Sequence, residues 1–233
     1  MTEAVLTPTQ ASPAAGWTLR DTFWGLVLGL SLGLALDALV LGGFRLHVSD
    51  SPTRALIIVT LTVASSAWMI GWAYVFSLRR HHLGLTAWGF VRPRLASLWA
   101  VPVAFLAAFL VSVLYGALVH PGPEKAPSWL LHTPAGIVAL VVSTCVVAPL
   151  AEEAFFRGFA LRGLAGTLGW SWAALVSSAL FGLVHLDPLR FLPLFAQGLV
   201  LCWVCRRGGS VWSSVTVHVL WNLLATIAAI ASG

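Results

Sequence analysis

The sequence predicts an all-α membrane protein, a multi-pass transmembrane bundle of about seven or eight helices with a polar site inside the membrane. Of its 233 residues, 59% are apolar and only 9% are charged, whereas about a quarter of the residues of a soluble domain are charged. Long apolar stretches separate the charges, and a helix of ~20 apolar residues crosses the hydrocarbon of a bilayer. The ten-residue alternating segments of a membrane barrel are absent, so the spans are predicted to be helices.

Seven apolar stretches are the predicted spans, and each is about long enough to cross the bilayer at 1.5 Å per helical residue. In chain order they cover residues 23–44, 55–78, 95–119, 133–151, 163–184, 191–205 and 208–233. We divide the chain into a polar N-terminal tail (1–18), an N-terminal set of transmembrane helices (19–132) and a helical core (133–233).

The first span carries a row of small residues. Gly25, Gly29 and Gly33 follow one another at intervals of four, which places them on one face of the helix. This GxxxGxxxG face predicts close packing against another helix.

The basic residues predict the topology of the chain. The formal net charge is +5, and twelve of the thirteen basic residues are arginines, most of them at the ends of spans. If the N-terminus is cytoplasmic, nine basic residues lie inside and four outside, which fits the positive-inside rule. The charge therefore indicates an orientation in a membrane rather than nucleic-acid binding. The first twenty residues have no basic cluster, so we expect the first span to be retained rather than cleaved as a signal peptide.

The three cysteines indicate neither a disulfide framework nor a redox site. Cys145, Cys202 and Cys205 all lie inside apolar stretches, where a thiolate is costly. The spacing of Cys202 and Cys205 matches a redox motif, but it falls on a predicted membrane helix with no adjoining strand.

Ionisable residues interrupt the apolar sequence in the last hundred residues. A charged side chain inside a bilayer is expensive, so each one is a functional-site hypothesis. The candidate site residues are Glu152, Glu153, Arg157, His185, His218 and Asn222.

Their spacing predicts that they meet at one depth. A turn near Gly169 is expected to close a helical hairpin centred near residue 168. Glu152 lies 16 residues before this centre and His185 lies 17 residues after it, so both are roughly 24 to 26 Å from the turn. His218 and Asn222 lie roughly 14 to 20 Å along the last span, counted from Gly209.

Helical angles separate the two glutamates. Glu153 and Arg157 are four residues apart and share a face, so we expect them to form an ion pair. Glu152 faces another direction and is free to act as a base. His218 and Asn222 are also four apart and project from one face.

Three motifs in order produce a family resemblance. The segments EEAFFR (152–157), FGLVH (181–185) and HVLWN (218–222) resemble the EExxxR, FxxxH and HxxxN motifs of the CPBP intramembrane proteases. This family includes the CAAX prenyl endopeptidases of the Ras-converting type and bacterial proteins linked to bacteriocin processing or self-immunity. The resemblance covers roughly residues 133 to 230, and it implies a bacterial inner-membrane protein.

The resemblance implies a role for each candidate residue. Glu152 and His185 would activate water for attack on a peptide carbonyl, and His218 and Asn222 would stabilise the oxyanion. Glu153 and Arg157 would support the site. Donors in a low-dielectric pocket can stabilise such an oxyanion by a few kcal/mol. The expected substrate is a membrane-associated or prenylated-type peptide or protein, met near the inner face of the membrane.

Two alternatives remain. The first is a non-proteolytic family member that binds a partner or confers bacteriocin immunity, with the polar cluster retained for structure. The second is a zinc site, since two histidines and a glutamate can bind this metal. No cofactor is predicted. If His218 and Asn222 bind the oxyanion, only Glu152 and His185 remain as possible zinc ligands. Neither an HExxH helix nor a GxSxG elbow occurs. The expected partners are membrane lipid and a peptide substrate, without nucleic acid.

Overall fold

The computed structural model describes residues 16–41, 51–120 and 128–232. These residues form helices and turns without a strand, which confirms the all-α prediction. The predicted N-terminal tail lies outside the described residues up to position 15. Trp17 is already buried and stacks on Phe159, so the packed part of the chain begins before residue 19.

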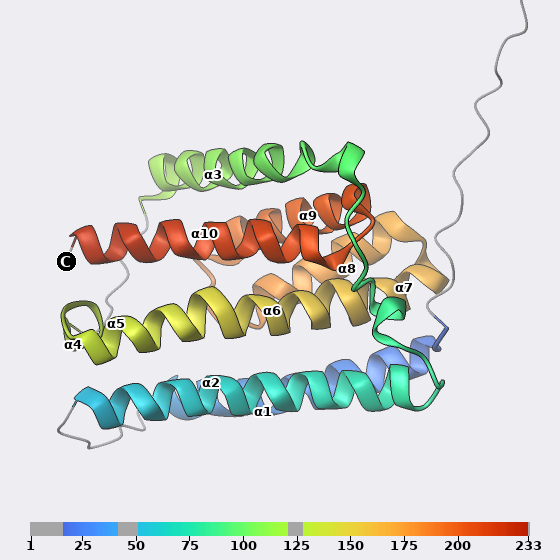
Figure 1. Ribbon diagram of the computed structural model, residues 1–233, viewed down its shortest axis with the longest axis horizontal. Coiled ribbons are helices and arrows are strands. Elements are labelled where there is room, and N and C mark those ends of the chain that lie inside the picture. The colour runs from blue at the N-terminus through green and yellow to red at the C-terminus, as the bar shows by residue number, and fades with distance from the viewer. Residues whose placement is uncertain (1–15, 42–50, 121–127, 233) are drawn as a thin grey trace, which may run out of the picture.

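The N-terminal helices form two opposite edges of the bundle. They are α1 (Leu19–Leu41), α2 (Ser51–Tyr74) with its π-helical extension η1 (Val75–Arg79), the 3₁₀ turns η2 (Leu85–Trp88) and η3 (Leu95–Ser97), and α3 (Ala100–Val119). Figure 1 shows α1 and α2 side by side along one edge and α3 along the other, where α3 packs on α9 and α10. Thr18 and Asp21 fix the start of α1 as a reciprocal capping box, with each side chain accepting the other's backbone N–H.

The C-terminal helices fill the middle of the bundle. They are α4 (Ser128–His132), α5 (Pro134–Leu140), η4 (Val141–Val147), α6 (Ala148–Glu153), η5 (Ala154–Ala160), α7 (Leu161–Leu168), α8 (Trp170–Leu183), α9 (Phe191–Gly208) and α10 (Val211–Ser232). The segments from α5 to α7 are continuous, and they form one long helix of 35 residues.

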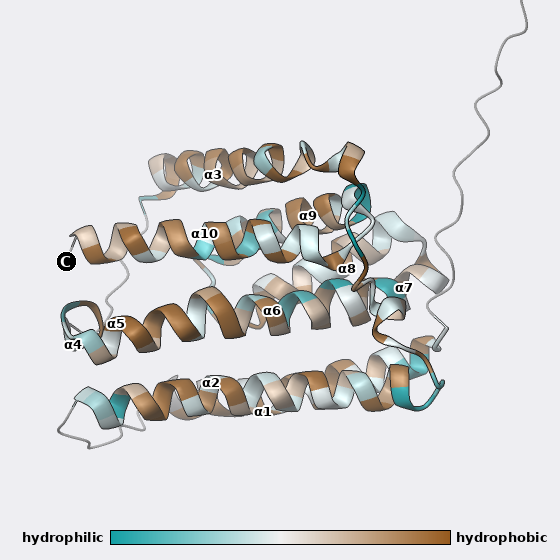
Figure 2. Ribbon diagram, viewed as in Figure 1, coloured by the Kyte–Doolittle hydropathy of each residue, from teal (hydrophilic) through white to brown (hydrophobic). Residues whose placement is uncertain are grey.

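Five described segments are long and apolar enough to cross a membrane. They are Leu19–Leu36, Ser51–Arg79, Leu95–Val119, Pro134–Leu168 and Val211–Ala231. The predicted end of the fourth span at residue 151 is wrong, because its helix continues through the charged residues to Leu168. Glu153 and Arg157 are paired inside the protein, so their charges do not end the helix. Figure 2 shows apolar residues along most of the helices, with hydrophilic residues near α7 and the turns beside it and at the start of α2.

Helices α8 and α9 form a hairpin that returns to the end of the bundle where it begins. α8 has only 14 residues, about 21 Å, which is short of the ~30 Å of hydrocarbon. The helices run antiparallel, because Gly198 packs on Ser178 and Gly182 on Phe191. The predicted turn before α8 is confirmed at Gly169, whose φ of 73° favours glycine.

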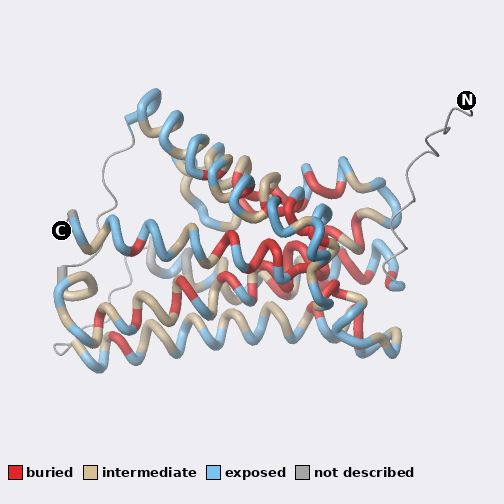
Figure 3. Tube along the Cα trace, turned by 45° about the horizontal axis from the view of Figure 1, so that its top comes forward, coloured by how far each residue is buried: buried red, intermediate tan, exposed pale blue. Residues whose placement is uncertain are grey.

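We call the end of the bundle that contains Leu19, Arg79, Gly169 and Gly208 the arginine-rich end. Figure 3 shows the buried residues concentrated toward this end. The loop between α2 and α3 closes it, since the buried Trp88 donates to Ser77 Oγ at 2.9 Å and the Gly89 carbonyl accepts from Val211 N at 3.0 Å.

The predicted glycine face of α1 packs closely over only part of its length. A Cβ on Gly25 would lie 2.4 Å from the Phe159 ring, and one on Gly29 would lie 2.7 Å from the Phe155 ring. Close packing is therefore confirmed at these two positions. The prediction of close packing is wrong at Gly33, where a Cβ would have no neighbour within 4 Å.

Candidate active site

The two glutamates lie on a short α-helical segment between two π-helical ones. α6 ends at Glu153, η4 precedes it and η5 follows it. A π turn closes its hydrogen bond over five residues instead of four, and it is common at functional sites. It also leaves carbonyls for other donors. Ser177 Oγ donates to the Phe156 carbonyl of η5 at 3.0 Å, and Asn222 Nδ2 donates to the Thr144 carbonyl of η4 at 2.7 Å.

Glu153 is the centre of a sealed ion-pair network. Arg157 Nη1 donates to Glu153 Oε1 at 2.8 Å, and both side chains have no exposed area. This confirms the pairing predicted from the four-residue spacing. Arg157 Nη2 donates to the Gly198 carbonyl at 3.2 Å, and the guanidinium carbon lies 4.6 Å from the centre of the Phe181 ring. A buried pair is stable only with such additional partners.

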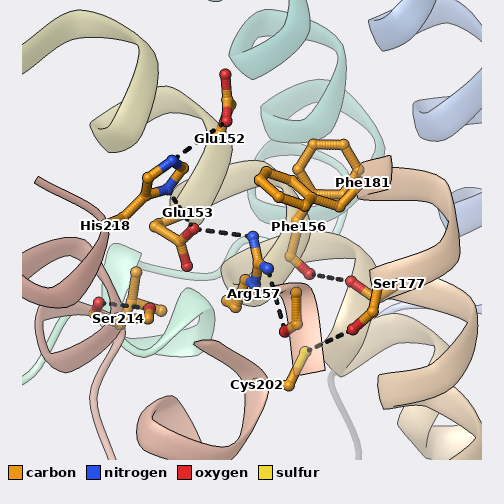
Figure 4. Close-up of polar contacts among 12 residues, drawn as sticks. Glu152, Glu153, Phe156, Arg157, Ser177, Phe181, Cys202, Ser214 and His218 are labelled. Atoms are coloured by element: carbon orange, nitrogen blue, oxygen red, sulfur yellow. Dashed lines mark hydrogen bonds and ion pairs between the residues drawn. The ribbon is translucent and has the colours of Figure 1, made fainter. Parts of the chain in front are cut away.

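His218 joins the two glutamates. Its Nδ1 lies 2.9 Å from Glu153 Oε1 and its Nε2 lies 3.8 Å from Glu152 Oε2 (Figure 4). An ionised carboxylate only accepts hydrogen bonds, so Nδ1 carries the proton in this contact. Nε2 therefore faces Glu152, as an acceptor in the neutral ring or as a donor in the imidazolium.

Glu152 lies in a more open environment than Glu153. Its side chain keeps 24% of its area exposed. It lines a cavity of about 380 Å³ bounded by α1, α2, the long helix and the end of α8. Of the described residues that line this cavity, Glu152 is the single ionisable one. The sequence-based separation of the two glutamates therefore corresponds to two different environments.

His185 lies in the turn that follows α8. Its Nδ1 donates to the Phe181 carbonyl at 2.7 Å, which leaves Nε2 as an acceptor. The Phe181 ring lies between the two histidines, with its centre 5.1 Å from the His185 ring and 5.8 Å from the His218 ring. Val184, the neighbour of His185, lines the same cavity as Glu152. The described contacts include no hydrogen bond between His185 and Glu152.

Asn222 lies one helical turn beyond His218 on α10. One of its amide protons is given to the Thr144 carbonyl, and the second remains available. Asn222 therefore ties α10 to the π-helical segment before α6, rather than to the glutamates directly.

The three cysteines are buried, and Cys202 Sγ contacts Ser178 Oγ at 3.7 Å beside the Glu153–Arg157 network (Figure 4). Within residues 16–41, 51–120 and 128–232, no group of three or more His, Cys, Asp or Glu side chains could hold a metal ion.

Sequence reasoning missed several partners of the site. The Gly198 carbonyl, the Thr144 carbonyl and the Phe181 ring all contact predicted site residues. Phe181 was visible as the first residue of the FxxxH motif. The two backbone carbonyls could not be predicted from the sequence, because every residue has a backbone carbonyl.

Comparison with known families gives a match over the C-terminal part of the chain. Residues 134–224 match the family described as Type II CAAX prenyl endopeptidase Rce1-like. This match confirms the predicted family resemblance. All six candidate residues lie inside the Rce1-like region. The chain is also similar to a Bacillus subtilis (strain 168) protein named "Putative membrane peptidase YdiL", at 25% identity over 137 residues.

The aligned region covers 57% of this chain and 56% of the Bacillus protein, so the chain spans about half the length of that curated relative. No solved structure matches the chain. Together, the Rce1-like region and the apolar helices indicate an integral membrane protein of a peptidase family.

Proposed function

We propose that the chain is an intramembrane endopeptidase, in which Glu152 and His185 activate a water molecule for attack on a peptide bond. The observation that carries this proposal is the contrast between the adjacent glutamates. Glu153 is sealed and paired with Arg157, whereas Glu152 is partly exposed to a cavity. Only the second arrangement leaves a carboxylate able to exchange a proton with water.

The proposed reaction is general-base hydrolysis. The Glu152 carboxylate accepts a proton from water while the water oxygen attacks the carbonyl carbon, and the same proton then goes to the leaving amine. The His185 Nε2 acceptor orients the water, since Nδ1 is held by the Phe181 carbonyl. No metal is needed for these steps, and none is assigned.

The oxyanion would meet donors from α10. His218 can donate from Nε2 only as an imidazolium, because its Nδ1 already donates to the Glu153 carboxylate. Asn222 would contribute the amide proton that the Thr144 carbonyl does not use. Each such donor in a water-poor pocket stabilises the transition state by about 3 kcal/mol.

The proposed substrate is a membrane-associated peptide or protein of the prenylated type, as the name of the matching family suggests. We further propose the inner membrane of a bacterium as the location, with the N-terminus in the cytoplasm. The basis is the gathering of arginines at one end of the bundle.

One observation favours a second candidate function. His218 and Asn222 both have structural partners, the Glu153 carboxylate and the Thr144 carbonyl. The same cluster could therefore be retained in a non-proteolytic protein that binds a membrane partner or confers immunity to a bacteriocin. In that case Glu152→Gln would leave the cellular function intact.

Comparative terminal proteomics tests the two functions. Membranes that contain equal amounts of the wild type or of Glu152→Gln are compared for newly formed peptide termini. The endopeptidase produces termini that are absent with Glu152→Gln. Identical termini in both samples would contradict the enzyme and favour the partner-binding function.

A further inference from the structure

The cavity beside Glu152 extends in one direction only. Its walls follow α1 from Gly29 to Leu36 and α2 from Ile58 to Met69. α1 leaves the arginine-rich end and α2 returns to it, so Leu36 and Ile58 are the lining residues farthest from that end. The twelve residues from Ile58 to Met69 span about 16 Å. The cavity therefore runs from the level of Glu152 away from the arginine-rich end.

The opposite direction is closed by packed aromatic rings. Phe155, Phe156 and Phe159 are at most 1% exposed, and they belong to one apolar core with Trp17 and Trp88. This core lies between the cavity and the arginine-rich end, where Figure 3 also shows the densest burial. A substrate that came from that end would have to displace the core.

The glycines of α1 mark where the packing opens. Gly25 and Gly29 are in contact with the Phe159 and Phe155 rings, so neither position has room for a side chain. Gly33, one turn farther along, lines the cavity and has free space where its Cβ would be. A Cβ at position 33 would therefore point into open space, with no neighbour within 4 Å.

The chemistry of the walls fits an apolar peptide. The lining is mostly aliphatic, with three hydroxyl residues on α2: Thr62, Ser65 and Ser66. Thr62 Oγ1 donates to the Ile58 carbonyl at 2.9 Å and Ser65 Oγ to the Thr62 carbonyl at 3.1 Å, so both oxygens remain acceptors for a peptide N–H. A cavity of about 380 Å³ lies within the size range of ligand sites.

We propose that this cavity holds the apolar residues beside the scissile bond, that Gly33 sets the largest side chain admitted, and that substrate arrives from the end opposite the arginines. The proposal rests on the proposed function of Glu152. It also replaces the expectation of cleavage near the inner face, because the positive-inside rule makes the arginine-rich end the cytoplasmic one.

Thiol labelling tests the direction of access without depending on cleavage. Ser65→Cys and Arg207→Cys are each made in a background with the three native cysteines replaced by alanine. A membrane-impermeant sulfonated maleimide is then applied to intact cells and to inverted vesicles. We expect Ser65→Cys to react from the side opposite to Arg207→Cys. Labelling of both from one side, or no labelling of Ser65→Cys from either side, would overturn the access route.

Gly33→Leu tests the cavity itself. Added to Ser65→Cys, it should abolish the labelling, because the leucine occupies the space. Gly71→Leu is the matched control, since Gly71 lies on α2 outside the cavity and also has nothing within 4 Å of its Cβ position. It should leave the labelling unchanged. Equal labelling with Gly33→Leu and Gly71→Leu would show that position 33 does not border the accessible space.

Cleavage preference tests the role of position 33 in specificity. Gly33→Leu should cut sites flanked by large apolar residues at least about tenfold less often than the wild type, and should retain sites flanked by glycine or alanine. Gly71→Leu should keep the wild-type preference. An unchanged or uniformly reduced set of sites would contradict the size limit while leaving the proposed function intact. If the wild type and Glu152→Gln give the same termini, the proposed function fails, and the labelling still decides the access route.

Discussion

The helix that carries the glutamates separates two regions of the bundle. On the side of α9 and α10, Glu153 and Arg157 are fully buried and in contact with His218 and the Gly198 carbonyl. On the side of α1 and α2, Glu152 keeps a quarter of its side chain exposed, beside an apolar cavity. The sealed region can fix positions but cannot exchange protons with a substrate. The open region can exchange protons, and it depends on the sealed one for its geometry.

The largest effects should distinguish these regions directly. Glu152→Gln should lower cleavage at least about 10²-fold, the usual contribution of a general base, with unchanged thermal unfolding in detergent.

Arg157→Met leaves the Glu153 charge buried without its partner, so it should cost about 3 to 5 kcal/mol of stability and lose activity with the fold.

The double variant Glu153→Gln/Arg157→Met sharpens this test. It removes both buried charges, so it should melt at a higher temperature than Arg157→Met alone. Equal melting of Glu152→Gln, Glu153→Gln and Arg157→Met, or no recovery in the double variant, would show that the two glutamates do not differ in the way described.

His185 tests whether the open region includes the turn after α8. His185 is exposed and its described hydrogen bond is the one to the Phe181 carbonyl. His185→Ala should therefore abolish cleavage with little change in thermal unfolding. Activity close to that of the wild type would remove His185 from the site and leave Glu152 to act without it.

The α10 residues should give intermediate effects in both measurements. His218→Ala removes a buried contact to Glu153, and Asn222→Ala removes the bond to the Thr144 carbonyl. Each should cost about 1 to 3 kcal/mol in stability and slow cleavage strongly. To separate the two effects, cleavage is compared at a temperature where circular dichroism shows each variant fully folded. Full activity of the folded variants would assign both residues to the sealed region alone.

The smallest effect on cleavage is expected for the cysteines. Cys145, Cys202 and Cys205 are buried, and none lines the cavity. Their joint replacement by alanine should lower the melting temperature modestly and leave cleavage intact in assays below that temperature. Loss of cleavage by a folded triple variant would show that a thiol takes part in the chemistry.

Patterns that depend on local spacing were predictable from the sequence. The four-residue interval placed Arg157 on Glu153, and Gly169 marked the turn of the hairpin, because helix periodicity and positive φ are properties of neighbouring residues. The assignment of catalytic roles to the six site residues stays a prediction.

Features that depend on what lies opposite a residue were not predictable. Gly25, Gly29 and Gly33 share one helical spacing, yet only the third faces open space, since no aromatic ring stands across from it. The contact of His218 with both glutamates also required the relative rotation of two helices. The predicted span at residues 163–184 combines the end of α7 with the short α8. Only one glycine separates these two helices, so their apolar residues form a continuous stretch in the sequence.

The π-helical segments on either side of α6 give the chain a built-in rotational adjustment. Each accommodates one more residue per hydrogen-bonded turn than an α-helix does. Deleting a single residue from η4 would restore α-helical pairing and leave the segments after it facing as they do now, because the π turn absorbs the extra residue. Deleting a residue from the α-helical α5 instead would turn everything after it by about 100°. Glu152 and Glu153 would then both leave their present neighbours. A lineage could therefore gain or lose one residue at η4 without moving either charge, whereas the same change in α5 would move both.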